Sequence, residues 1–218
     1  MAVQRVTITV VDEVAGTGEI QGDLVLPDEP RGLVIFAHGS GSSRHSPRNR
    51  MVASVLNDAS FGALLFDLLT PAEEEVDLRT RELRFDIRLL TDRLLAAIDA
   101  VGGRPDTAQL PLGLFGASTG AAAALIAAAE RADQVRAVVS RGGRPDLAAE
   151  ALPAVRAPTL LVVGGLDDVV IGLNRDAASR MTCEHDVAIV PGATHLFEEL
   201  GTLEEVSRLA IGWFERHL

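Results

Sequence analysis

A glycine-flanked turn places Ser118 where a nucleophile could stand. The turn reads Gly116-Ala-Ser-Thr-Gly120, and it lies between an apolar run and a long alanine-rich segment. Glycines at these two positions remove the side chains that would collide where a strand turns sharply into a helix. The pattern predicts a nucleophile elbow, in which the serine hydroxyl is presented for attack on a carbonyl carbon. A tight turn with an incidental serine is the alternative interpretation.

Serine chemistry needs two further side chains, and both occur later in the chain. A hydroxyl is a weak nucleophile at neutral pH, so an imidazole must accept its proton and a carboxylate must orient that imidazole. Asp167 and His195 follow Ser118 in that order, each in a loop that contains glycine. Asp168 stands beside Asp167, and only one of the two can reach the imidazole, because successive side chains of extended backbone face opposite ways. We expect a catalytic triad of Ser118, His195 and one of these acids.

An acyl transfer also needs two backbone N–H donors for the oxyanion. One should come from Thr119, the residue after the nucleophile, and the other from Ser40, in the loop His38-Gly39-Ser40 after an apolar run. Two side chains are candidates for binding substrate. Arg141 could hold a substrate carboxylate by a two-pronged contact or pair with a neighbouring acid, and His45 lies in a loop near the expected site.

Apolar runs without polar alternation predict strands that are buried on both faces of a parallel sheet. They occupy residues 33–37, 62–66, the run before the elbow, 135–140, 158–163 and the region around 186–190, with an antiparallel hairpin of 3–11 and 19–26 at one edge. Helices are predicted from residue 47, over 77–101, behind the elbow, near 173–181 and over 202–217, and a solvated acidic loop over 71–77. Alternating strands and helices require right-handed crossovers, so the candidate loops should gather at the carboxyl ends of the strands.

Composition narrows the class of protein. The 218 residues suit a single domain that spans the whole chain, 1–218. The net charge of -11 argues against nucleic acid as a partner, and the absence of lysine excludes Schiff-base chemistry. No apolar run approaches the roughly 18 residues of a membrane span and no secretory signal is recognisable, so we expect a cytoplasmic protein without membrane contact. No pattern predicts a metal or a cofactor, and we expect a monomer or homodimer with a small-molecule substrate.

These motifs together resemble the α/β-hydrolase superfamily and, within it, the compact dienelactone-hydrolase-like family. The resemblance covers nearly the whole chain and rests on His38-Gly39, the elbow at Ser118, the pattern Gly164-Gly-x-Asp167-x-x-Val170, and Gly192-x-x-His195. It implies the α/β-hydrolase fold, with helices on both faces of a mostly parallel sheet, and it favours Asp167 as the acid of the triad. Too few residues separate 135–140 from 158–163 for the helical lid of larger relatives, so no large lid domain is expected.

The activity that the resemblance implies is hydrolysis of a small ester or lactone through an acyl-enzyme. Dienelactone hydrolases proper carry cysteine at the elbow, where this chain has Ser118. A thioesterase or peptidase would use the same triad with another leaving group. A receptor or scaffold that keeps the fold without hydrolysis is the alternative from a different class, because fold does not fix function.

Overall fold

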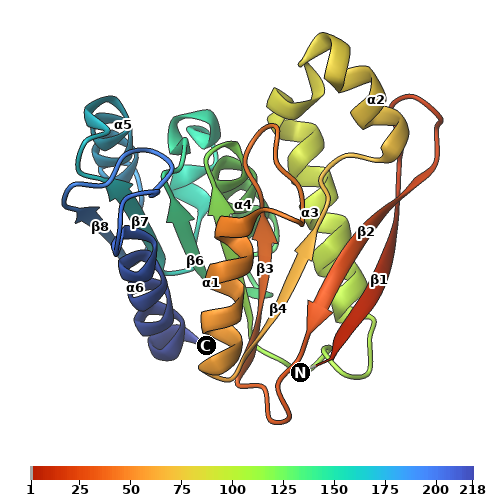
Figure 1. The fold of residues 1–218 in the computed structure, drawn as a ribbon, viewed down its shortest axis with the longest axis horizontal. Coiled ribbons are helices and arrows are strands. Elements are labelled where there is room, and N and C mark those ends of the chain that lie inside the picture. The colour runs from red at the N-terminus through yellow and green to blue at the C-terminus, as the bar shows by residue number, and fades with distance from the viewer. Residues whose placement is uncertain (1) are drawn as a thin grey trace.

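The centre of the protein is an eight-stranded sheet (Figure 1). The computed structural model describes residues 2–218. The strands are β1 Val3–Val10, β2 Gly18–Val25, β3 Gly32–Ala37, β4 Phe61–Phe66, β5 Leu112–Ala117, β6 Val135–Arg141, β7 Thr159–Gly164 and β8 His185–Val190. They lie in the order β1-β2-β4-β3-β5-β6-β7-β8. β1 and β2 form an antiparallel hairpin at one edge, β2 pairs antiparallel with β4, and the remaining neighbours pair in parallel.

The burial of the strands follows their apolar patterns. Every residue of β3, β4, β5 and β7 is buried, as expected for strands that are covered on both faces. β1 at the edge buries only alternate residues, Val6, Ile8 and Val10. The edge hairpin and the mostly parallel sheet of the α/β-hydrolase fold are therefore confirmed.

Helices cover both faces of this sheet (Figure 1). They are α1 Pro47–Asp58, α2 Pro71–Thr80, α3 Ile87–Gly102, α4 Thr119–Glu130, α5 Asp168–Ala178 and α6 Thr202–His217, with 3-10 turns at Leu83–Phe85, Pro145–Ala148 and Leu152–Ala154. α1 and α6 pack on one face, around Phe36, Phe115 and Phe214, and α3, α4 and α5 pack on the other. Only two short turns separate β6 from β7, so within residues 2–218 no large lid covers the strand ends.

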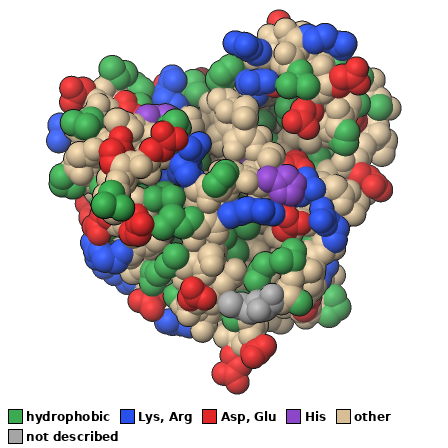
Figure 2. Space-filling view, viewed as in Figure 1, with side chains coloured by type: hydrophobic (Ala, Val, Ile, Leu, Met, Phe, Trp, Pro, Cys, Tyr) green, Lys and Arg blue, Asp and Glu red, His purple; other side chains and the backbone are tan. Residues whose placement is uncertain are grey.

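The surface of the protein carries both signs of charge. On the face drawn in Figure 2, acidic and basic side chains are interspersed among apolar and neutral ones. None of the helices in residues 2–218 combines the length and the apolar character that crossing a membrane requires.

The acidic segment after β4 is a helix, so the prediction of a solvated loop over 71–77 is wrong. The side chain of Thr70 accepts a hydrogen bond from Glu73 N, and the Glu73 carboxylate accepts one from Thr70 N. Pro71 follows at the first helical position. This reciprocal capping box and the proline start α2 despite its run of carboxylates.

Two ion pairs with buried carboxylates hold α2 against the rest of the protein. Of the ten residues of this fully described helix, only Glu73 and Asp77 are buried. Glu73 Oε1 lies 2.5 Å from Arg93 Nη2 on α3, and Asp77 Oδ2 lies 2.5 Å from Arg84 Nε in the turn Leu83–Phe85. Charge pairs rather than an apolar face therefore fix the position of α2.

Two further helix boundaries differ from the prediction. The periodic stretch 77–101 is interrupted because Arg81 adopts a left-handed conformation, with a φ of 60°, and ends α2. Asp86 then caps α3 by accepting a hydrogen bond from Leu89 N at 3.0 Å. The helix expected near 173–181 begins earlier, at Asp168, directly after the loop that follows β7.

Candidate active site

Ser118 occupies a sharp turn between β5 and α4. Its φ of 51° and ψ of -119° form a conformation that residues with a side chain keep only where their surroundings enforce it. Close packing requires the two flanking glycines: a Cβ at Gly116 would lie 2.4 Å from Ala121 Cα, and one at Gly120 would lie 2.3 Å from Ala37 O. The Ser118 side chain makes no capping hydrogen bond to α4, so its hydroxyl remains available to other partners.

The loops after β7 and β8 bring a carboxylate and a histidine together. His195 Nδ1 lies 2.7 Å from Asp167 Oδ2. Asp167 stands at the start of α5, yet its side chain makes no capping hydrogen bond there and turns to the imidazole instead. With Nδ1–H donating to this carboxylate, Nε2 of His195 keeps a lone pair that can accept a proton. Asp168, the neighbouring acid, is the first residue of α5 and is exposed.

Backbone hydrogen bonds fix these two loops to each other. Gly165 N donates to Val190 O at 2.8 Å, and Leu166 N donates to Ala193 O at 2.9 Å. Val170, one turn into α5, is buried and holds the start of that helix against the protein. The distance between acid and imidazole is therefore set by rigid strand ends.

Ser118 and His195 line one cavity of about 190 Å³. Its walls come from the loops after β3 and β8, the ends of β5 and β6, the elbow and the start of α1: Gly39, Ser40, Ser42, Ser46, Arg48, Asn49, Ala117, Ser118, Arg141, His195 and Leu196. The loop after β3 closes on the elbow, because a Cβ at Gly39 would lie 3.2 Å from Ser118 Cβ. The backbone around Gly39 and Ser40 thus lies beside the serine.

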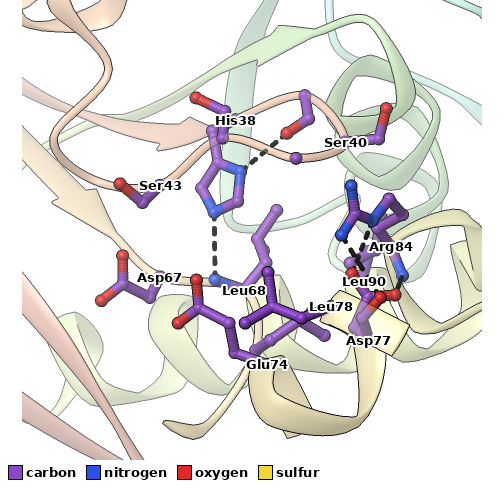
Figure 3. A pocket seen from close by; sticks show the side chains of 14 residues that line it. His38, Ser40, Ser43, Asp67, Leu68, Glu74, Asp77, Leu78, Arg84 and Leu90 are labelled. Atoms are coloured by element: carbon purple, nitrogen blue, oxygen red, sulfur yellow. Dashed lines mark hydrogen bonds and ion pairs between the residues drawn. The ribbon is translucent and has the colours of Figure 1, made fainter. Parts of the chain in front are cut away.

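His38 holds the loops after β3 and β4 together (Figure 3). Its Nδ1–H donates to Gly39 O at 2.9 Å, and its Nε2 accepts a hydrogen bond from Leu68 N at 3.2 Å. Burial lowers the pKa of His38, because the charged imidazolium is disfavoured away from water. Since backbone groups engage both ring nitrogens, His38 is a neutral, structural residue of this loop.

Arg141, at the end of β6, is a buried guanidinium without a carboxylate partner among residues 2–218. Its Nη2 lies 3.4 Å from Asn49 Oδ1, while Nε and Nη1 are buried without a hydrogen-bond partner. Burial and the nearby charge of Arg48 lower the pKa of Arg141 to about 10, so it stays protonated at neutral pH. A buried charge without a partner is costly, and an anion in the cavity would relieve that cost.

Two residues of the cavity wall, Arg48 and Asn49, were not anticipated from the sequence. A signal for them existed, because Ser46 caps α1 by accepting a hydrogen bond from Asn49 N at 3.3 Å, and this cap begins the turn that carries both. His45 is exposed and does not belong to the residues that line the cavity. The backbone N–H of His45 donates to Ser43 Oγ at 3.2 Å within a tight turn that leaves the ring at the surface.

The chain matches known hydrolases in sequence and in fold. Residues 20–208 match the dienelactone hydrolase family. A dienelactone hydrolase from Anabaena variabilis ATCC 29413 has a TM-score of 0.93 and 55% sequence identity, over 100% of both chains. Est1E from Butyrivibrio proteoclasticus shares the fold alone, with a TM-score of 0.78 and 15% identity over 96% of this chain and 98% of that one.

A longer relative carries a different name. A protein of Mycobacterium tuberculosis named "Putative phosphoribosyl transferase" is 58% identical over 208 residues, which are 95% of this chain and 46% of that protein. The chain therefore spans about half the length of this curated relative, whose name describes the longer protein as a whole. The matched residues 20–208 include the elbow and the loops after β7 and β8, and the sheet is that of the α/β hydrolases. This chain belongs to the dienelactone hydrolase family.

Proposed function

We propose that this protein is a serine hydrolase that cleaves a small ester or lactone through an acyl-enzyme on Ser118. The proposal depends most on the 2.7 Å hydrogen bond between His195 and Asp167, beside the cavity that Ser118 also lines. Membership in the dienelactone hydrolase family supports hydrolysis, and the serine at the elbow would supply the nucleophile.

The reaction follows from the roles of these groups. His195 Nε2 accepts the Ser118 proton as Oγ attacks the carbonyl carbon, and the negative charge moves to the carbonyl oxygen. The backbone N–H groups of Ser40 and Thr119 stabilise that oxyanion, and Asp167 stabilises the imidazolium. The imidazolium then protonates the leaving oxygen as the carbon–oxygen bond breaks. Water attacks the acyl-enzyme by the same route and releases the acid.

Activity should fall in acid, because only a neutral imidazole can accept the serine proton. The measurement is kcat/KM for an uncharged nitrophenyl ester over a series of pH values, with the chemical step limiting. A rate that stays constant throughout this series would contradict the role of His195.

The cavity favours a substrate that carries a carboxylate. Two guanidinium groups, those of Arg48 and Arg141, line it together with no acidic side chain. Arg48 Nη1 already binds Glu198 Oε1 at 2.9 Å, whereas Arg141 has two buried nitrogens without a partner in the described residues. A carboxylate is the group that arginine binds best in such a place.

Arg141→Ala should raise KM for acidic esters by about 10- to 100-fold, which corresponds to the usual free energy of a hydrogen bond to a charged group. KM for neutral esters should change much less, because these esters have no carboxylate for Arg141 to bind. The measurement compares monomethyl succinate with dimethyl succinate. Arg156→Ala is the matched control, since this arginine is 76% exposed and lies outside the cavity. Equal increases for both esters would assign Arg141 a structural role.

Other functions of the same fold are separated by direct tests. Thioesterases and peptidases share the triad, and turnover of nitrophenyl esters, lactones, thioesters and peptides ranks these leaving groups. A receptor or scaffold would bind ligands without turnover. Labelling of Ser118 by a fluorophosphonate together with ester turnover supports the hydrolase, and the absence of both across the panel would reject it.

A further inference from the structure

The loop that follows β3 also lines a second cavity (Figure 3). Its volume is about 140 Å³. It is partly open, and it is lined by this loop, the residues after β4, α2, the turn Leu83–Phe85 and α3. Gly39, Ser40 and Ser42 line both this cavity and the one that contains Ser118. The loop beside the nucleophile is thus a wall common to the two cavities.

Four leucines give the second cavity its apolar surface: Leu68, Leu69, Leu78 and Leu90. Leu68 and Leu90 are buried and form part of the main core, whereas Leu78 on α2 is 69% exposed. An exposed leucine over a cavity offers apolar area that a ligand can cover. An apolar cavity of comparable volume holds a benzene ring in another protein, so a group of about six carbons would fit.

The ionic groups around this cavity are mostly engaged within the protein. Arg84 Nε lies 2.5 Å from Asp77 Oδ2. Asp67 accepts a hydrogen bond from Arg44 N at 2.9 Å and is also paired with the Arg44 guanidinium. Glu74 lies at the exposed rim and adds a negative charge there. Paired charges attract an ionic ligand weakly, and Glu74 repels an anion, so an uncharged group is favoured.

The two cavities have opposite charge. Three carboxylates and one guanidinium line the second cavity, whereas two guanidiniums and no carboxylate line the first. Ser118 lines the first cavity, and Gly39 of the shared loop lies beside it, so a carbonyl attacked by Ser118 lies close to that loop. A substrate with an acid at one end and an apolar group at the other would therefore be oriented by both cavities at once.

We propose that the second cavity binds an uncharged hydrocarbon group of the substrate, of about six carbons. The substrate lies across the loop after β3, with its carboxylate toward Arg141 and its apolar end against Leu78. This assignment rests on the proposed function, because the scissile carbonyl defines what lies on either side. It makes the preferred substrate an ester with an acidic part and an apolar part on opposite sides of the carbonyl.

Binding to the Ser118→Ala variant tests the assignment without turnover. Two pairs of esters keep the acid constant and change the apolar group: benzyl against methyl half-esters of succinate, and phenylacetyl against acetyl esters of glycolate. In at least one pair the aromatic member should bind about tenfold more tightly by calorimetry, since the partly open cavity covers only part of the ring. Equal affinities within both pairs would overturn the proposal.

A second substitution locates that preference. Adding Leu78→Glu to the Ser118→Ala variant should abolish the tighter binding of the aromatic esters, because it places a carboxylate in the wall of the cavity. Glutamate is also a good helix-forming residue, so α2 should persist. Leu200→Glu is the matched control, since this leucine is fully exposed and lines neither cavity, and it should keep the preference. A preference that survives Leu78→Glu, or one that Leu200→Glu removes as well, would overturn the assignment.

Turnover by the wild type separates this proposal from the hydrolase itself. If none of the esters is cleaved while binding still depends on Leu78, the cavity assignment holds and the hydrolase proposal fails. If the esters are cleaved but neither binding nor kcat/KM depends on Leu78, the hydrolase proposal holds and the cavity assignment fails. Tighter binding of an aminomethyl-substituted benzyl ester than of the benzyl ester would show that the cavity takes a cation, and would also overturn the assignment.

Discussion

Ser118→Ala is expected to lower kcat for a small ester by on the order of 10⁴- to 10⁶-fold, because the nucleophile, base and acid act as one unit. The fold should persist, since the serine side chain makes no capping hydrogen bond that alanine would lose. The unusual φ of 51° is imposed by the packing of the neighbouring glycines, which the substitution leaves in place. The measurement is kcat and KM for nitrophenyl acetate, together with the thermal unfolding midpoint of both proteins.

The matched control for this result is Ser54→Ala. Ser54 is an exposed serine of α1 that does not line the cavity, so its substitution should leave both kcat and the unfolding midpoint near the wild-type values. The assignment of Ser118 as the nucleophile would be refuted if Ser118→Ala, freed of wild-type contamination, kept more than a tenth of the wild-type kcat.

Asp167→Asn is expected to lower kcat by about 10⁴-fold, the effect seen when the carboxylate of such a triad becomes an amide. An amide can offer N–H to His195 Nδ1, which favours the wrong tautomer, and it cannot stabilise the imidazolium. The 2.7 Å hydrogen bond between Asp167 and His195 is the contact at risk. The measurement is kcat for the same ester, with labelling of Ser118 by a fluorophosphonate as a second readout.

Asp168→Asn tests whether the neighbouring acid, rather than Asp167, orients His195. Asp168 is exposed at the start of α5, so the substitution should change kcat by less than about tenfold, or roughly 1.4 kcal/mol. The opposite order of effects would show that Asp168 is the acid. If both variants stayed active, Asp146 would be the next acid to test, although its Oδ2 lies 2.7 Å from Arg144 Nη2.

The sheet and the elbow could be predicted because their causes are local in the sequence. Strands buried on both faces must be apolar throughout, and β3, β4, β5 and β7 are. Gly116 packs against the backbone of Ala121 at the start of α4, and Gly120 packs against the backbone of Ala37 on the neighbouring strand β3. Because neither position has room for a side chain, the two glycines appear in the sequence at a fixed spacing around Ser118. Topology then brings the loops after β5, β7 and β8 to one edge.

The helix α2, the role of Arg141 and the remaining walls of the cavity could not be predicted, because they depend on contacts between residues that are far apart in the sequence. The capping box of α2 is visible at Thr70 and Glu73, but the helix has no apolar stripe, and helical periodicity is read from such stripes. Whether Arg141 pairs with an acid or faces a ligand depends on which side chains surround it after folding. The Ser46 cap predicts that Arg48 and Asn49 lie in the first turn of α1, but whether that turn reaches the cavity depends on how α1 packs on the sheet.

The attachment of α2 has a consequence for how this protein can change. Its two buried residues, Glu73 and Asp77, fasten the helix through arginines, and its other side chains take little part in the core. Substitutions at such exposed positions usually alter the free energy of unfolding by no more than about 0.5 kcal/mol. Leu78 belongs to these positions and also lines the second cavity. Selection can therefore alter this segment toward new substrates while the sheet that carries Ser118 keeps its stability.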